Sequence, residues 1–150
     1  MATFRAADRD DLGAIVALLA DDPPGQGRED SSDPPGPAYV GAFQAIIADP
    51  NQLLAVADAD GVVGCMQISF IPGLSRLGMW RGQIESVRIA ASHRGAGLGR
   101  DFFEWAIEQC RDRGCGLVQL TTDKSRADAL RFYQSLGFAD SHTGMKLSLD

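Results

Sequence analysis

A glycine-rich stretch between a predicted strand and a predicted helix constrains this 150-residue chain more than any other feature. Residues 81–90 are rich in strand-forming side chains, and residues 97–113 carry apolar side chains at helical spacing. Between them, the stretch Arg94-Gly95-Ala96-Gly97-Leu98-Gly99-Arg100 places three glycines at alternate positions. Its backbone N–H groups can converge on an anion at the start of the helix, and its two arginines add positive charge. The sequence therefore predicts a binding site for a phosphate-bearing ligand.

The positions of the glycines do not match the patterns of two common phosphate-binding loops. A P-loop requires GxxxxGK[ST], and no lysine follows the glycines here. A dinucleotide fingerprint requires GxGxxG, but its last position would be Arg100 when counted from Gly95, or Phe102 when counted from Gly97. A plain strand-to-helix turn that binds nothing is the remaining alternative, although three spaced glycines and two arginines exceed what a turn needs.

Alternation and helical spacing predict the elements around this loop. We expect further strands over residues 3–6, 52–58, 62–71, 117–122 and 145–149, and further helices over residues 12–20, 39–48 and 127–136. The strand-helix-strand unit over residues 81–122 implies one parallel strand pair, whereas hairpins link the other strands. The sequence thus predicts a single α/β domain over residues 1–150, with a mixed, mostly antiparallel sheet flanked by helices on both faces.

The charge, the apolar runs and the cysteine and histidine content of the chain argue against several kinds of binding partner. A net charge of -6, from 14 basic and 20 acidic residues, argues against a nucleic-acid partner. No signal-peptide pattern or membrane-length apolar run occurs, so we expect a cytoplasmic protein with no membrane partner. The three cysteines, Cys65, Cys110 and Cys115, form no CxxC pair and the two histidines lie far apart, so we expect reduced thiols and no metal site.

Two segments carry a resemblance to a known family. Arg94 to Gly99 matches the pattern [Gln/Arg]-x-x-Gly-x-[Gly/Ala], and Ala129 to Phe138 matches A-x-x-F-Y-x-x-x-G-F. In these segments, and in the strand before the loop, the sequence resembles the GNAT superfamily of N-acetyltransferases, most strongly over Arg81 to Phe138. The resemblance implies a GNAT-like fold and direct transfer of an acetyl group from acetyl-CoA, a co-substrate, to a primary amine of a small molecule or peptide. It also implies that no metal is used and that a homodimer is possible.

The same resemblance implies which residues hold the coenzyme. Main-chain groups of Val87 and Ile89 would pair with the pantetheine arm like an extra strand. The pyrophosphate would bind the loop, that is Arg94, Gly95, Ala96, Gly97, Leu98, Gly99 and Arg100. Many members carry an asparagine three residues before the alanine of the second segment, where this chain has Arg126. Ser125 or Arg126 would then supply the contact that the asparagine usually makes.

Two catalytic residues are expected. An alkylammonium has a pKa of about 10.4, so the acceptor arrives charged and needs a base. Glu85 is our candidate base, because strict alternation places it on the same face as Val87 and Ile89 unless a bulge intervenes. Its alternative role is an ion pair with Arg81 or Arg88. Tyr133 matches the position of the family's general acid, and its alternative role is an aromatic core residue.

A proline-rich stretch over residues 21–37 is the candidate acceptor loop. It holds five of the seven prolines and five carboxylates against Arg28 alone. That charge suggests a cationic acceptor such as a polyamine, an aminoglycoside-like molecule, an amino acid amine or a peptide amine. Two other functions stay open at this point: a non-catalytic acyl-CoA-binding or regulatory module, and an enzyme that uses another phosphorylated ligand.

Overall fold

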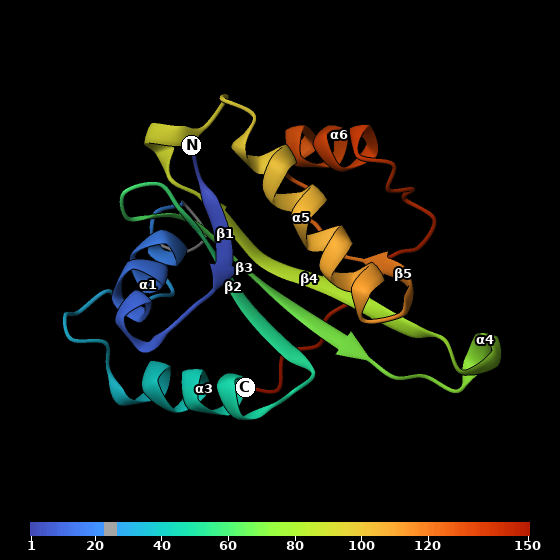
Figure 1. The fold of residues 1–150 in the computed structure, drawn as a ribbon, viewed down its shortest axis with the longest axis horizontal. Helices are drawn as coiled ribbons and strands as arrows, with labels where there is room; N and C mark the ends of the chain where they lie inside the picture. The colour runs from blue at the N-terminus through green and yellow to red at the C-terminus, as the bar shows by residue number, and fades with distance from the viewer. Residues whose placement is uncertain (23–26) are drawn as a thin grey trace.

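A mixed five-stranded sheet forms the centre of the computed structural model, which describes residues 1–22 and 27–150 (Figure 1). Its strands are β1 (Thr3–Ala6), β2 (Gln52–Asp58), β3 (Val62–Ile71), β4 (Trp80–Ile89) and β5 (Cys115–Gln119). They lie side by side in chain order, with β1 to β4 antiparallel and β4 and β5 parallel. The predicted mixed sheet with one parallel pair around the glycine loop is confirmed.

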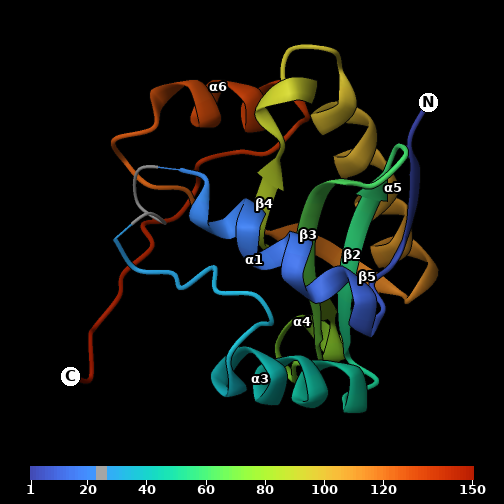
Figure 2. The same ribbon diagram turned by 90° about the vertical axis from the view of Figure 1, so that its left-hand side faces the viewer.

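Helices cover both faces of this sheet (Figures 1 and 2). The helices α1 (Leu12–Ala20) and α3 (Pro37–Ala48) pack on one face, and α5 (Leu98–Asp112) and α6 (Ala127–Ser135) pack on the other. Three shorter pieces are η1 (Arg9–Asp11), α4 (Ser75–Gly78) and η2 (Ala91–His93). Strand alternation divides the two cores, because Leu54 and Val56 face α1 and α3 whereas Ala55 and Ala57 face α5.

The core beneath α5 fixes the position of α6. Phe102 and Phe103 are fully buried by their spacing along α5. The Phe103 ring meets the rings of Phe132, Tyr133 and Phe138 at centroid distances of 5.7, 5.4 and 6.4 Å, each in an edge-to-face arrangement. This cluster anchors the inner face of α6 on α5, and it thereby determines where the Tyr133 side chain lies.

A bidentate ion pair joins the first strand to the first helix. The guanidinium of Arg5 donates to the two carboxylate oxygens of Asp11 at 2.8 and 3.0 Å, and also to Asp58 at 3.0 Å. Asp8 begins η1, since its side chain accepts a hydrogen bond from the N–H of Asp10 at 2.9 Å.

The expected last strand is absent. Residues 145–149 alternate between apolar and polar side chains, but no residue of this segment pairs with another described residue. Alternation describes only the side chains, and a strand also needs a neighbour for its backbone. The prediction of a strand over these residues is therefore wrong for the single chain. The predicted loop over residues 21–37 includes residues 23–26, which lie outside the described residues.

Candidate active site

A cleft opens where β4 and β5 separate. Their pairing ends at Gln83 and Gln119, whose side chains share a hydrogen bond of 3.0 Å. β4 continues to Ile89, whereas the chain after Gln119 turns toward α6, so the second half of β4 has no neighbour on that side among the described residues. The resulting cavity of about 100 Å³ is lined by Ile84, Glu85, Ser86, Val87, Arg88, Leu120, Thr121, Thr122, Asp123, Arg126 and Tyr133.

A β-bulge in β4 decides which side chains face which way. Glu85 pairs with Gln67 and Arg88 pairs with Cys65, so β4 carries one residue more than β3 between these pairs. Ser86 takes up the extra residue with a φ of 57°, in the left-handed region. Ile84, Val87 and Ile89 consequently all pack toward α5. Glu85 points to the opposite face, and the expectation that it shares a face with Val87 and Ile89 is wrong, because the bulge reverses the alternation.

Glu85 is exposed in the middle of the sheet. Its carboxylate makes no ion pair or hydrogen bond with any residue in the described ranges, so neither Arg81 nor Arg88 is its partner. Arg88 instead lies 2.8 Å from the carboxylate of Asp22, just after α1, and both side chains are largely buried. This second ion pair neutralises the nearby arginine and leaves the Glu85 carboxylate open to the cleft.

Tyr133 reaches the same cleft from α6. Its ring packs against Phe103, and its hydroxyl has no hydrogen-bond partner in the described part of the chain. Burial raises the pKa of the Tyr133 phenol, and the positive charges of Arg126 and Arg88 only partly offset this rise. The phenol is therefore protonated at neutral pH and can donate a proton into the cleft.

The glycine loop presents unpaired N–H groups. Gly95 and Gly97 have φ values of 80° and 84°, a conformation that side chains disfavour, and Gly97 is the N-cap residue of α5. The N–H groups of residues 95–100 have no acceptor among the described residues, and the first intrahelical bond is made by Asp101 to Gly97 at 3.1 Å. These six donors, free among the described residues, lie at the positive end of a 15-residue helix, an arrangement that can bind an anion.

The two arginine side chains of the loop have other partners in this structure. Arg94 donates to the carbonyl of Ile89 at 3.1 Å, and Arg100 donates to the carbonyl and hydroxyl of Ser135 at 3.3 and 3.1 Å. Arg100 thus ties α5 to α6. The groups left to bind an anion here are therefore backbone N–H groups, and the guanidinium groups tie the loop and α5 to their neighbours.

The cleft brings together only part of the expected site. Glu85, Val87, Arg126 and Tyr133 line it. Ile89 and the glycine loop continue from the upper end of β4, outside the lining. Ser125 is expected to contact the coenzyme, but its hydroxyl and its N–H both donate to the Asp123 carboxylate instead, at 2.7 and 2.9 Å. Sequence reasoning missed Ser86 and the wall formed by Thr121, Thr122 and Asp123, which no motif marks.

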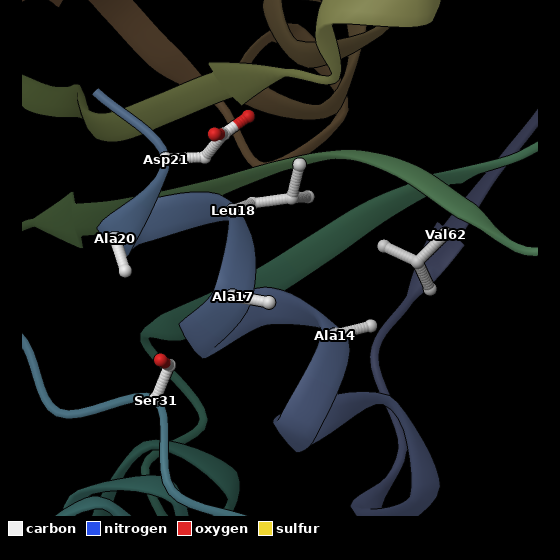
Figure 3. A pocket seen from close by; sticks show the side chains of 7 residues that line it. All are labelled: Ala14, Ala17, Leu18, Ala20, Asp21, Ser31 and Val62. Carbon is white, nitrogen blue, oxygen red and sulfur yellow. The ribbon is translucent and has the colours of Figure 1, made fainter.

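A larger open hollow lies on the outer side of α1 (Figure 3). Its volume is about 530 Å³, and it is lined by Ala14, Ala17, Leu18, Ala20, Asp21, Ser31 and Val62. Only Asp21 and Ser31 bring polar side chains, and none of the expected catalytic or coenzyme residues borders it. The candidate active site is therefore the smaller cleft between β4 and the segment after β5.

The described residues contain neither a metal-binding cluster nor a membrane-spanning helix. No group of three or more His, Cys, Asp or Glu side chains in residues 1–22 and 27–150 is arranged to hold a metal ion. None of the helices in these ranges has the length and apolar character to cross a bilayer.

Known proteins match this chain along most of its length. The model of the Acetyltransferase (GNAT) family matches residues 13–138. Aminoalkylphosphonate N-acetyltransferase of Salmonella typhimurium is 33% identical over 70% of this chain and 68% of its own. Glucosamine 6-phosphate N-acetyltransferase of Trypanosoma brucei brucei is 35% identical over 59% of this chain and 58% of its own length. A crystal structure from Bacillus halodurans C-125, described as a transcriptional regulator, is 46% identical, with a TM-score of 0.96 over 99% of this chain and 100% of that one.

Proposed function

Since this chain belongs to the acetyltransferase (GNAT) family and is an acyltransferase, we propose that it transfers an acetyl group from acetyl-CoA to a primary amine by direct attack. The observation that carries the proposal is the cleft itself. In the described part of the chain, it holds a carboxylate, Glu85, and a phenol, Tyr133, that have no partner, and both lie beside the half of β4 that no strand pairs with. One group can take a proton and the other can give one.

The chain offers a matching site for each part of the coenzyme. Beyond Gln83 no described strand pairs with the β5 side of β4, and main-chain groups of Val87 and Ile89 would pair there with an extended pantetheine arm. The unpaired N–H groups of residues 95–100 would hold the pyrophosphate at the start of α5. Arg126 at the start of α6 lines the same cleft and brings a positive charge near the phosphates. Bound there, the coenzyme supplies the activated acetyl group.

The acceptor would approach from the face to which the bulge turns Glu85. On that face the neighbours of Glu85 are uncharged polar side chains. The side chains of Gln67 and Ser69 both donate to the side-chain Oε1 of Gln52, at 2.8 and 3.0 Å, and the side chain of Gln83 accepts from that of Gln119. These side chains can recognise amine and hydroxyl groups without competing with Glu85 for the positive charge.

The proton transfers follow from the two sides of β4. Glu85 accepts a proton from the acceptor ammonium, directly or through one water, which frees the nitrogen lone pair. The nitrogen then bonds to the thioester carbonyl carbon, and the carbon–sulfur bond breaks. Tyr133 donates its phenolic proton to the departing sulfur, and the nitrogen loses its second proton. Of the two protons that the nitrogen gives up, one restores the Tyr133 phenol by way of solvent and the other is released from Glu85 to solvent. The raised pKa of Tyr133 keeps this proton in place until the sulfur becomes basic.

The acceptor is a small cationic amine in this proposal. Glu29 and Asp30 are held over α3, since the Tyr39 hydroxyl donates to Glu29 and accepts from the N–H of Asp30, both at 2.9 Å. The Salmonella and Trypanosoma relatives are named for small amine-bearing acceptors, which supports a small molecule over a peptide.

The experiment is a panel of amines assayed by thiol release from acetyl-CoA, with coenzyme binding measured by calorimetry. Turnover with one class of amines supports the proposal and identifies the acceptor. Tight coenzyme binding without turnover of any amine supports a binding module, and absence of coenzyme binding refutes the assignment of the cleft and loop.

Two loop variants test the charge argument. Glu29→Gln and Asp30→Asn should each raise the acceptor KM by roughly two- to fivefold, the effect of one exposed ion pair, and leave coenzyme affinity unchanged. Asp112→Asn, at the far end of α5, removes the same charge at a distance and should leave the acceptor KM unchanged. An equal rise of the acceptor KM in all three variants would show that the net charge of the protein, and not the loop, attracts the acceptor.

A further inference from the structure

A row of uncharged polar side chains crosses the sheet next to Glu85. Successive strands contribute Gln52, Ser69, Gln83 and Gln119, each of which is the pairing partner of the next, and these four residues are called the polar row below. The row lies on the face of the sheet that α1 and α3 cover (Figure 2), opposite the core beneath α5. Packing alone favours apolar side chains at such partly buried positions, so the polar row calls for a role in hydrogen bonding.

The hydrogen bonds of the polar row use only part of each amide. The Oε1 of Gln52 accepts from Gln67 and Ser69 at 2.8 and 3.0 Å, and its Nε2 has no partner in the described part of the chain. The Oε1 of Gln83 accepts from the Nε2 of Gln119 at 3.0 Å, and the Nε2 of Gln83 has no partner among the described residues. The Oε1 of Gln119 is likewise without a donor in these ranges. The row therefore presents both N–H donors and carbonyl acceptors, and the bonds between the amides hold them in place.

This mixture of donors and acceptors selects a kind of chemical group. A hydroxyl both donates and accepts, whereas an ammonium only donates and a phosphate only accepts. Gln83 precedes Glu85 by two residues on the same face of β4, which is a separation of about 7 Å along the strand. A hydroxyl on the second or third carbon of an amine bound at Glu85 would thus come within hydrogen-bonding reach of the polar row.

The arginines that β4 places on this face are not arranged to bind an anionic acceptor. Arg88 is paired with Asp22, at 2.8 Å. Arg81 lies four residues before Glu85, about 13 Å along the strand, and its Nη1 would be 3.0 Å from a Cβ on Gly73, in the connection after β3. A small acceptor held at Glu85 does not span that distance. The surroundings of the polar row therefore favour a neutral substituent over a phosphate.

On the basis of the proposed acetyl transfer, which sets the position of the amine, we propose that the polar row selects acceptors whose amine carries hydroxyl groups and no phosphate. Gln83 donates to a hydroxyl near the amine and Gln119 accepts from it, while Gln52 donates to hydroxyls farther away in longer acceptors. These residues determine specificity and leave the proton transfers to Glu85 and Tyr133. Each hydrogen bond to a hydroxyl should change kcat/KM by about two- to tenfold.

The test compares small amines that differ in their substituents. Aminopropanediol, propylamine and aminoethylphosphonate are assayed by thiol release from acetyl-CoA with the wild type, Gln83→Met and Gln109→Met. Gln109 is a half-buried glutamine of α5, on the other face of the sheet, and its variant is the matched control. We expect Gln83→Met to lower the ratio of kcat/KM for aminopropanediol to that for propylamine by about two- to tenfold, because intrinsic differences between the two amines cancel in this comparison. Gln109→Met should keep the wild-type ratio, and aminoethylphosphonate should be the poorest acceptor of the wild type.

Side-chain amide signals in isotope-edited NMR give a second readout on the unaltered chain with coenzyme A bound. Aminopropanediol should shift the NH₂ signals of Gln83 and Gln119 more than propylamine does, and it should leave those of Gln109 in place. An unchanged ratio in Gln83→Met, equal shifts with both amines, or a preference for aminoethylphosphonate would each overturn the inference and leave acetyl transfer standing. Absence of turnover with every amine would refute the proposed function instead, and the amide signals would then decide the inference by themselves.

Discussion

Replacing Gly97 by alanine should strain the anion loop without filling any space. Gly97 has a φ of 84°, and a Cβ added there would meet no atom within 4 Å. The whole cost is therefore that of a left-handed conformation, about 1–2 kcal/mol for an L-residue. For a chain of this length, a loss of that size lowers Tm by about 2–8 °C.

Gly99→Ala is the matched control, at the second residue of α5. Gly99 has no positive φ, and its Cβ would lie 3.7 Å from the Phe132 ring, an ordinary contact. Alanine is favoured over glycine within a helix by up to about 1 kcal/mol, so Gly99→Ala should match the wild type or exceed it. The Tm of Gly97→Asn should lie between those of the wild type and Gly97→Ala, because asparagine tolerates the left-handed region better than alanine does.

The assay is thermal unfolding by circular dichroism, followed by calorimetric titration with coenzyme A. Gly97→Ala should lower both Tm and coenzyme affinity, because a loop that relaxes its φ turns the N–H groups of residues 95–100 away from one another. A Gly97→Ala variant as stable as the wild type, or a Gly99→Ala variant that loses more than Gly97→Ala, would refute the backbone argument.

Three further predictions concern other parts of the fold. A Cβ at Gly82 would clash with the Cys110 sulfur, so Gly82→Ala should lower the free energy of unfolding, measured with denaturant, by about 1–3 kcal/mol. Adding Cys110→Ala should restore part of this free energy. Strictly additive effects of the two changes would show that the clash is not the cause. Arg5 holds the pKa of Asp11 below its ordinary value, so the pair stabilises the fold above about pH 3.9 and its contribution disappears as pH falls through the lower, folded pKa. Asp11→Asn should therefore lower Tm at pH 7 and flatten the acid part of the Tm–pH curve, and an unchanged curve would assign acid sensitivity to other carboxylates. Because the pKa of Tyr133 is raised above its ordinary value of about 10, its phenol should keep its proton up to about pH 10, and kcat should not fall below that pH through loss of this proton. A decrease in kcat near pH 8 that disappears in Tyr133→Phe would contradict this.

Features that depend on residues close together in the sequence could be predicted. The glycine spacing marked the loop, and the helical period of Phe102, Phe103, Ala106 and Cys110 marked the buried face of α5. The bounds of β2 and β3 match the prediction because turn residues flank both strands. In each case the residues that determine the conformation lie within a few positions of the element itself.

Features set by distant contacts were not predictable. The bulge at Ser86 places a serine in a conformation that usually calls for glycine, and it arises from the pairing of β4 with β3. It decides the direction of Glu85, so alternation alone gave the wrong face. Arg88 finds its partner at Asp22, beyond the end of α1, and no spacing rule links the two positions. The segment over residues 145–149 has the alternation of a strand, but alternation does not supply the edge that it needs.

The central claim is that Glu85 and Tyr133 act on the same substrate from the two sides of β4. Its most direct test is steady-state thiol release with the best amine acceptor for the wild type, Glu85→Gln and Tyr133→Phe, with Asp112→Asn, at the far end of α5, as the control outside the cleft. We predict that kcat falls by about 10²–10⁴-fold in each cleft variant, the usual contribution of a positioned acid or base, while coenzyme affinity and the Asp112→Asn rate stay near wild type. A kcat that is unchanged in either Glu85→Gln or Tyr133→Phe would contradict the assignment of that residue.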